Sequence, residues 1–530
     1  FGGRCFCPRC AVAFRDWLRA RYGSLAALNE AWGTVFWSQT YGAWDEIDVP
    51  PSGSVPMPGG FGGAAPSPAH ALDYRRFISD SYVRYQRLQI EEIRRTSDAP
   101  ITHNMMGFGF GDIDYHALAQ DLDFLAWDNY PVLNHSDGWL EPALSCDAIR
   151  GLKNTPFWVM EQQVGPLGWE VIRSPRRGQL RLHTFQMIAH GAEAISYFRW
   201  RSARFGTEQH WYGILDHDGR PNRRLREVTE LVQEVGAIAP LLEGVVPSSQ
   251  AAVIYDYDSR FALEIQPTNP ALPHTRAVGA HYGALRQLGL GVDLRPPMAD
   301  LSEYSLVVAP SLYMIDEPLA AHLKAYVQNG GVLVLGPRSA FKDRTNAVPE
   351  RPLPAWLDDL VGLEVSDISS FIDMPPVRLR SSDGSSEGDF RGWFEELSPT
   401  SAQALYVYDE YDYAGGPAIT SNAFGEGRAV YVGGAATPAT LRDLYRTLAS
   451  DAGLGVFDLP EEVELVRVKK PDADAELLFL LNYSDREQLV ELPEEWCDQL
   501  GAGTPSRTVA LAPYGVALLK PVGVAVPVEQ

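Results

Sequence analysis

Two hydrophobic periods alternate along the first 245 residues of the chain. Apolar side chains recur at helical spacing over 11–32, and a second, longer helix is predicted over 72–96. Four short apolar runs predict strands at 101–105, 123–129, 157–160 and 194–199, separated by helical or loop stretches. Strands that alternate with helices form parallel sheets, so this part is predicted to be α/β. Polar and aromatic residues follow each run, as they do at the active-site face of a (β/α)8 TIM barrel. Four strand–helix units are visible, so the sequence predicts half of such a barrel.

The pattern changes near residue 245. Strands at 251–255, 306–309, 331–336 and 429–433, with helices at 281–288 and 318–329, predict a doubly wound α/β domain over 246–455. Short strands at 463–468, 476–482, 488–492 and 515–520 are separated by turn residues. They predict a small antiparallel, sandwich-like β-domain over 456–530. Pro and Gly crowd the segment 41–68, which is predicted to be a long loop.

Composition and charge narrow the classes of protein. The net charge is −23, so we expect no nucleic-acid partner, because phosphate backbones require clustered positive charge. No run of about 18 apolar residues occurs, so we expect no membrane-spanning helix and no membrane partner. The sequence starts at Phe1 without a signal-peptide pattern. We expect a cytoplasmic protein whose first residue marks a cut.

Three of the five cysteines fall within six residues, at Cys5, Cys7 and Cys10. An odd, clustered set does not predict a disulfide framework. The Cys-x-x-Cys spacing lets two thiolates bind one tetrahedral zinc, and Cys5 could supply a third ligand. The alternative is three reduced thiols in a loop, and the spacing alone leaves both open. A structural zinc takes four ligands, and the fourth is not identified in this sequence.

The clearest catalytic candidate is Glu161, which ends the apolar run 157–160. A carboxylate at the carboxyl end of a barrel strand is well placed for catalysis, although a surface glutamate at a strand end has the same pattern. Glycoside hydrolysis requires two carboxylates. Further acids at the same predicted face are Asp128, Glu170 and Glu208.

Aromatic and histidine side chains near these acids are weaker candidates. Trp169 is either a platform for stacking on sugar or a packed loop aromatic. Glu208 and His210 lie two residues apart in a predicted loop and could bind sugar hydroxyls. A metal role for this pair is not expected, and a histidine alone is more often structural.

Several motifs together resemble the glycoside hydrolase family 42 β-galactosidases. They are the cysteine run at 3–10, the segment 28–33, Phe36-Trp37-Ser38-Gln39, Trp127-Asp128-Asn129-Tyr130-Pro131, Met160-Glu161-Gln162, Ala189-His190-Gly191-Ala192 and Phe198-Arg199-Trp200-Arg201. The resemblance covers essentially the whole chain. It implies the C-terminal half of a (β/α)8 barrel over 1–245, an amidotransferase-like α/β domain used in trimer formation, and a small β-domain.

The resemblance also implies roles for individual residues. It implies retaining hydrolysis of terminal β-D-galactosides by two glutamates, with Glu161 as the nucleophile. Residues implied to contact the sugar are Tyr130, Trp169, Phe205, Glu208 and, more loosely because its loop is one residue shorter, His210. Cys5, Cys7 and Cys10 match three ligands of a structural zinc. A homotrimer that binds galactosides or galacto-oligosaccharides is expected.

One part of the family pattern is not in this sequence. The acid/base glutamate of the family lies in an Asn-Glu pair immediately before a segment like Phe1-Gly2-Gly3. We therefore expect the chain to lack the amino-terminal part of a family member, and to be inactive alone. The alternatives are a sugar-binding or scaffold fragment without catalysis, and an α-L-arabinopyranosidase.

Overall fold

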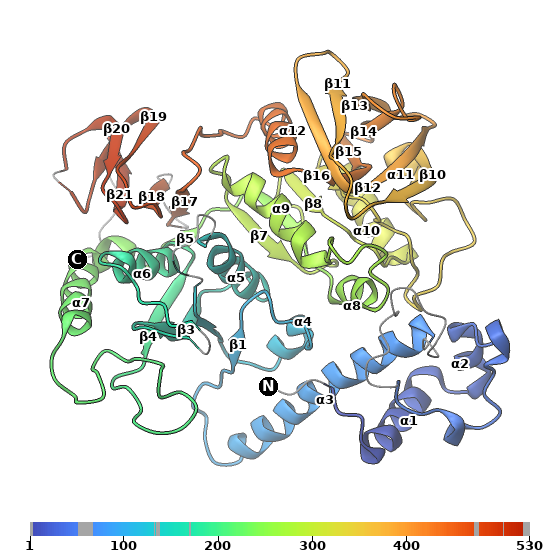
Figure 1. The fold of residues 1–530 in the computed structure, drawn as a ribbon, viewed down its shortest axis with the longest axis horizontal. Coiled ribbons are helices and arrows are strands. Elements are labelled where there is room, and N and C mark those ends of the chain that lie inside the picture. The colour runs from blue at the N-terminus through green and yellow to red at the C-terminus, as the bar shows by residue number, and fades with distance from the viewer. Residues whose placement is uncertain are drawn as a thin grey trace.

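Three sheets organise the chain, which the computed structural model describes at residues 4–50, 67–131, 133, 138–168, 171–470, 476–501 and 503–522 (Figure 1). The predicted loop at 41–68 falls partly outside the described residues, at 51–66. No helix among the described residues has the length and apolar character that crossing a membrane requires.

Helices form the start of the chain. They are α1 (Pro8–Tyr22), α2 (Leu25–Trp32), the short 3-10 turns η1 (Phe36–Ser38) and η2 (Trp44–Glu46), and α3 (Pro68–Arg94). The single helical run predicted over 11–32 is wrong, because the helix ends at Gly23 with φ 71° and a new helix begins after Ser24. The Ser24 side chain accepts a hydrogen bond from the Ala27 amide, which caps the new helix.

A parallel four-stranded sheet follows. Its strands are β1 (Asn104–Met106), β2 (Leu125–Asn129), β3 (Phe157–Gln163) and β4 (Ala192–Phe198), and they lie in sequence order. The accompanying helices are α4 (Tyr115–Ala119), α5 (Leu140–Gly151), α6 (Gln179–Ala189) and α7 (Arg223–Leu242). The α/β prediction and all four predicted strands are confirmed, with bounds shifted by a few residues.

A second sheet contains a parallel half. Strands β15 (Gly427–Val432), β9 (Val332–Leu335), β8 (Leu306–Ala309), β6 (Ala251–Ile254) and β7 (Val292–Arg295) run parallel in that spatial order. Helices in this region are α8 (Tyr257–Ile265), α9 (His274–Arg286), α10 (Glu317–Gln328), α11 (Asp358–Val361) and α12 (Pro438–Asp451). Strands β6, β8 and β9 are fully buried, as strands covered on both faces must be.

An antiparallel extension of this sheet was not predicted. It contains β10 (Leu363–Ser370), β11 (Val377–Ser381), β12 (Glu387–Pro399), β13 (Gln403–Tyr408), β14 (Pro417–Phe424) and β16 (Gly434–Ala436). The doubly wound prediction therefore holds for only part of 246–455. Side chains of β11 alternate between buried and exposed, so this strand lacks the continuous apolar run that revealed the parallel strands.

The third sheet is antiparallel, as predicted. It is built from β17 (Val463–Lys469), β18 (Glu476–Asn482), β19 (Gln488–Asp498), β20 (Ser506–Leu511) and β21 (Val516–Pro521), and the short β5 (Val246–Pro247) pairs with β17. Strand β20 was not predicted. Among the described residues these strands form one sheet rather than two layers of a sandwich. Leu477 and Phe479 pack toward α6 and α7, whereas Leu478 and Leu480 face a separate core.

Buried charges join the three sheets to one another. The Asp147 carboxylate on α5 accepts hydrogen bonds from Arg150 at 2.7 Å, from His190 Nδ1 at 2.8 Å and from the Tyr282 hydroxyl on α9 at 2.6 Å. The other nitrogen of His190 lies 3.0 Å from Glu464 on β17. A network that reaches α5, α9 and β17 therefore connects all three parts of the chain.

The charges in this network compensate one another. Glu464 also accepts a hydrogen bond from Arg286 of α9 at 2.9 Å, and both side chains are at most 2% exposed. Burial alone would lower the pKa of His190, but the charges of Asp147 and Glu464 outweigh burial and raise it. Burial would likewise raise the pKa of Glu464, and the charges of His190 and Arg286 lower it instead.

We predict that Glu464→Gln destabilises the fold by about 3–5 kcal/mol, because it leaves the buried charge of Arg286 uncompensated. The matched control is Glu462→Gln, which removes an exposed pair with Arg486 and should cost about 1 kcal/mol or less. Urea unfolding of the two variants measures the difference. Equal losses of stability would show that the network is not structural.

Candidate active site

An irregularity in β3 determines where Glu161 lies. Val159 pairs with Trp127 of β2, whereas Glu161 pairs with Asp128, so Met160 is an extra residue on β3. The register between β3 and β4 shifts over the same residues. A bulge of this kind redirects side chains and is frequent beside active sites. Because of it, Glu161 rather than Met160 lies beside Asp128 at the carboxyl end of the sheet.

Tyr130 directly follows β2 and binds Glu161. Its hydroxyl donates a hydrogen bond of 2.5 Å to Glu161 Oε2. Rings of Phe198 and Trp211 lie edge-on to the Tyr130 ring, at 6.1 and 5.1 Å between centroids, and fix its orientation. Burial, followed by the hydrogen bond to Glu161, raises the pKa of Tyr130 well above its usual range. Tyr130 is therefore a neutral donor that orients the carboxylate.

A second carboxyl group lies beside Glu161. Burial raises the pKa of Asp128 to about 7, the charge of Glu161 adds to the shift, and a hydrogen bond from Asn104 opposes it. The Asn104 amide donates to Asp128 Oδ1 at 3.0 Å from β1. Asn104, Asp128 and Glu161 thus come together from three neighbouring strands, through the hydrogen bond from Asn104 and the pairing of Asp128 with Glu161. A carboxyl group with a pKa near neutrality can hold a proton where its neighbour is charged.

The loop after β4 holds the next candidate, Glu208. Arg199 donates to the Glu208 carboxylate, and the Arg199 guanidinium lies 4.3 Å from the ring centroid of Phe198. The charge of Glu208 is among those that raise the pKa of Tyr130, so it belongs to the same neighbourhood. Arg199 holds the Glu208 carboxylate in place, which suits it to accept hydrogen bonds from a ligand.

Two sequence candidates, Phe205 and His210, make no contact with Glu161 among the described residues. Phe205 is 78% exposed, with Arg204 over its ring, and His210 is exposed in the same loop. No hydrogen bond or ring contact joins either side chain to Glu161 or Tyr130 among the described residues. Trp169, like Glu170, lies outside the described residues.

The cysteine cluster lies at the start of α1. The sulfur atoms of Cys5, Cys7 and Cys10 are within 4.8 Å of one another. Tetrahedral zinc with bonds of about 2.3 Å separates its sulfur ligands by about 3.8 Å, so these thiols fit three positions of such a shell. A hydrogen bond from the Cys10 backbone lowers the pKa of Cys7 to about 7, whereas burial raises that of Cys10 to about 12. Cys7 precedes α1, whose amino terminus favours negative charge.

Comparisons with known proteins match this arrangement along the chain. Residues 1–238 match a family model described as β-galactosidase, 249–455 one described as β-galactosidase trimerisation domain, and 463–521 one described as β-galactosidase C-terminal domain. The chain is 36% identical over 566 residues to the β-galactosidase Bga of Halorubrum lacusprofundi, covering 98% of this chain and 77% of that relative. The chain belongs to the glycoside hydrolase family 42 β-galactosidases.

Other members agree in sequence and in fold. A β-galactosidase of Thermus thermophilus is 38% identical over 486 residues, with 88% of this chain and 70% of that protein covered. The crystal structure of a β-galactosidase from Bacillus circulans sp. alkalophilus superposes with a TM-score of 0.92 at 29% identity, covering 98% of this chain and 78% of that chain. The family models cover residues 1–238, 249–455 and 463–521, and they do not bear out the expected lack of an amino-terminal part.

Three residues of this candidate site were underrated or missed from sequence. Asp128 was only one of three further acids at the predicted face, and neither Asn104 nor Arg199 was proposed as a partner. The signal was present, because each of these residues ends or follows a predicted strand. Which strand ends face one another depends on register, and the bulge at Met160 is not visible in the hydrophobic pattern.

We predict that Asp128→Asn changes how stability depends on pH. The folded state holds the Asp128 proton up to about pH 7, whereas an unfolded aspartate loses it near pH 4. The native chain should therefore lose stability relative to the variant as pH rises from about 4 to about 7. The difference in thermal midpoint between the two proteins, measured across this range, reports the effect.

Asp98→Asn is the control, because Asp98 is exposed and lies outside the site. Its difference from the native chain should stay constant across the same range. A constant difference for Asp128→Asn would contradict the assigned pKa.

Proposed function

We propose that this chain carries the nucleophile of a retaining β-galactosidase, and that the nucleophile is Glu161. The observation that supports it most directly is the bulge that lays Glu161 against the hydroxyl of Tyr130. Family membership supports hydrolysis of terminal β-D-galactosides as the reaction. The four parallel strands fit our proposal that residues 1–245 form the C-terminal half of a TIM barrel.

The chemistry follows from the position of the carboxylate. A Glu161 oxygen attacks the anomeric carbon, the bond to the leaving oxygen breaks, and a galactosyl ester forms. Water then cleaves the ester at the same carbon, which restores the original configuration. Tyr130 holds Oε2 by its hydrogen bond, so that Oε1 is available for attack. Glu208, kept in place by Arg199, is suited to accept hydrogen bonds from sugar hydroxyls.

The second carboxyl group is a separate proposal. The family resemblance implies a glutamate outside these 530 residues as acid/base. Within the chain, Asp128 has the protonation that an acid requires, whereas Glu208 is paired with Arg199. If no acid within the chain serves, it cannot protonate the leaving oxygen of a natural disaccharide. It would then cleave only aryl galactosides, whose leaving groups depart unprotonated, or act solely as a sugar-binding or scaffold fragment.

Glu161→Gln should lower turnover by a factor on the order of 10⁴, because the amide is a poor nucleophile. Assays with a nitrophenyl β-galactoside and with lactose measure the loss and also test for an acid within the chain. Glu193→Gln, an exposed glutamate on the neighbouring strand β4, is the matched control and should retain activity. An α-L-arabinopyranoside in the same assay tests the alternative substrate.

Stereochemistry separates the two roles that Glu161 could have. In Glu161→Gly, azide should enter the space of the missing carboxylate and yield α-galactosyl azide. A β-galactosyl azide would show that Glu161 is the acid/base instead. Retention of native turnover by Glu161→Gln would refute a catalytic role altogether.

We also propose a structural zinc on Cys5, Cys7 and Cys10, with a fourth ligand that is not identified. The fit of the three sulfur atoms to a tetrahedral shell supports it. When bound, the ion crosslinks the start of α1 to the segment before it. Tyr74 of α3 donates to the Cys5 carbonyl, so the crosslink extends to the core of the first helices.

Metal analysis of the zinc-replete protein should find about one zinc per chain. Cys7→Ser should lose most of it and lower the thermal midpoint. Cys497→Ser, a cysteine of β19 outside the cluster, is the control. Equal zinc in both variants, or none in the native chain, would refute the site.

Assembly and location are further proposals. The match of residues 249–455 to a trimerisation domain supports a homotrimer. A cytoplasmic location and the absence of nucleic-acid and membrane partners stay predictions from sequence.

A further inference from the structure

A cavity of about 390 Å³ lies in the middle of the second sheet, away from Glu161. Ser311 after β8, Pro337 and Arg338 after β9, and Gly434 after β15 contribute to its wall. All are just past the carboxyl ends of parallel strands, which is where open α/β sheets bind ligands. Its volume is within the range of small-molecule sites.

Positive charge gathers in this cavity although the whole chain carries −23. Arg276, Arg338 and Arg391 line it, and Asp389 is the single carboxylate among the lining residues. Asp389 lies 3.6 Å from Arg391, so it offsets one of the three arginines. The lining keeps an excess of positive charge in an acidic protein, which favours an anion.

Arg338 is built into the wall of the cavity. It is 2% exposed, its guanidinium donates to the carbonyls of Pro267 and Leu272, and it lies 5.2 Å from the centre of the Trp393 ring. Its Nε has no hydrogen-bond partner among the described residues. Its φ of 65° is in the left-handed region, which costs a non-glycine residue energy and is most common at functional sites. The Nε–H of Arg338 therefore has no acceptor among the described residues, and a bound anion would supply one.

The amino terminus of α12 adds further donors. Thr437, Pro438 and Ala439 line the cavity, and the Thr437 side chain does not cap the helix. Backbone N–H groups of a first helical turn have no acceptor within the helix, and they carry partial positive charge. Helix amino termini of this kind bind phosphate and carboxylate groups.

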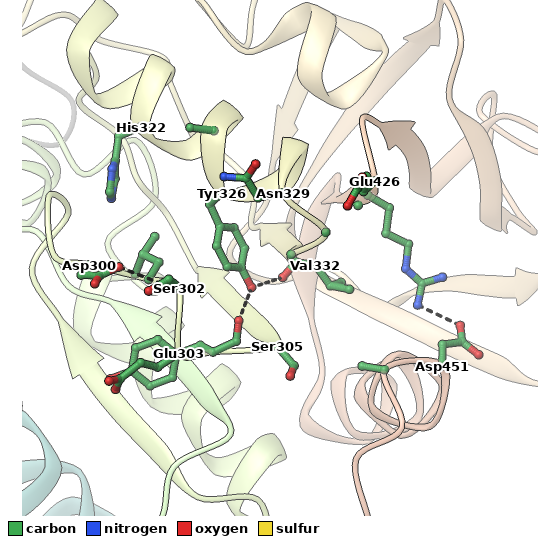
Figure 2. A pocket seen from close by; sticks show the side chains of 18 of the residues that line it. Asp300, Ser302, Glu303, Ser305, His322, Tyr326, Asn329, Val332, Glu426 and Asp451 are labelled. Atoms are coloured by element: carbon green, nitrogen blue, oxygen red, sulfur yellow. Dashed lines mark hydrogen bonds and ion pairs between the residues drawn. The ribbon is translucent and has the colours of Figure 1, made fainter.

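A second hollow lies at the opposite edge of the same sheet, and its lining can be compared with that of the first cavity (Figure 2). It has a volume of about 850 Å³ and lies at the amino ends of β8, β9 and β15. Its acids include Asp300, Glu303 and Glu426, Arg428 is paired with Asp451, and the Tyr326 hydroxyl is bonded to backbone carbonyls. Its arginine is paired and acids predominate in its lining, so it does not share the features of the arginine cavity.

We propose that the arginine cavity, lined by Arg276, Arg338 and Arg391, binds a small organic anion: a phosphate monoester or carboxylate with a body about the size of one hexose. The oxyanion accepts hydrogen bonds from Arg338 and from the first turn of α12. The exposed Arg276 and Arg391 close over it from the rim, and the apolar wall, with Trp393 and the alanines beside α12, contacts the body. This site is separate from Glu161 and does not depend on the proposed galactosidase activity.

Calorimetric titration of the whole protein at low ionic strength tests the proposal. Glucose 6-phosphate and glucuronate are the two anionic probes, inorganic phosphate measures the oxyanion alone, and glucose is the neutral control. We expect saturable binding of at least one anionic probe, weakened by added salt, and none of glucose. The stronger of the two organic anions identifies the head group.

Two substitutions in the lining of the cavity should change the binding affinity in opposite directions. Arg276→Gln should weaken binding roughly tenfold, because one charged hydrogen bond is lost. Asp389→Asn should tighten binding, because it removes the only carboxylate in the lining. Arg378→Gln, an exposed arginine of β11 outside the cavity, is the control and should bind as the native chain does. Failure of both anionic probes to bind, or equal binding by all variants, would overturn the proposal.

Discussion

The buried pair His190–Glu464, with Asp147 on the other side of the imidazole, is the contact on which the arrangement of the chain depends. Both ring nitrogens face carboxylates, whose charges raise the pKa of His190 against burial and so favour the doubly protonated ring, which can donate to both. Charges removed from water in this way are tolerated only if each keeps its partners. Asp147 lies on α5 between β2 and β3, and His190 lies between α6 and β4. The network therefore fixes the connections on both sides of β3, which carries Glu161.

The network is complete only within an interval of pH. The lowered pKa of Glu464 gives stability that is present above the usual pKa of glutamate and is lost as pH falls through the lower, folded value. The raised pKa of His190 works in the other direction: its stability is present below the usual pKa of histidine and is lost as pH rises through the raised value. Between these limits the docking of the third sheet on the first two is strongest, and it weakens toward either extreme. Acid therefore weakens this contact by protonating Glu464, and alkali weakens it by deprotonating His190.

The hydrophobic pattern correctly predicted strands that are buried along most of their length. The runs at 306–309 and 476–482 match β8 and β18 residue for residue, because both faces of these strands are covered. The antiparallel strands β10 to β14 were missed. Strand β11 alternates between buried and exposed positions and has no apolar run, whereas the apolar run at 404–408 in β13 was overlooked. Glu161 could be named from its place after such a run, but its partners could not. The extra residue at Met160 moves Glu161 opposite Asp128, and a register shift of one residue changes every neighbour of a side chain.

Both candidate sites use the carboxyl ends of parallel strands, yet their chemistry is opposite. In the first sheet these ends carry acids, and burial together with the charge of Glu161 raises the pKa of Asp128 to about 7. In the second sheet the corresponding ends carry Arg338 and the uncapped start of α12, which offer donors and positive potential. The backbone geometry is common to both: strands stop, chains turn outward, and side chains from neighbouring strands converge. Parallel topology therefore decides where a ligand can bind, and the few residues that follow each strand decide whether it is a sugar beside carboxylates or an anion beside arginines.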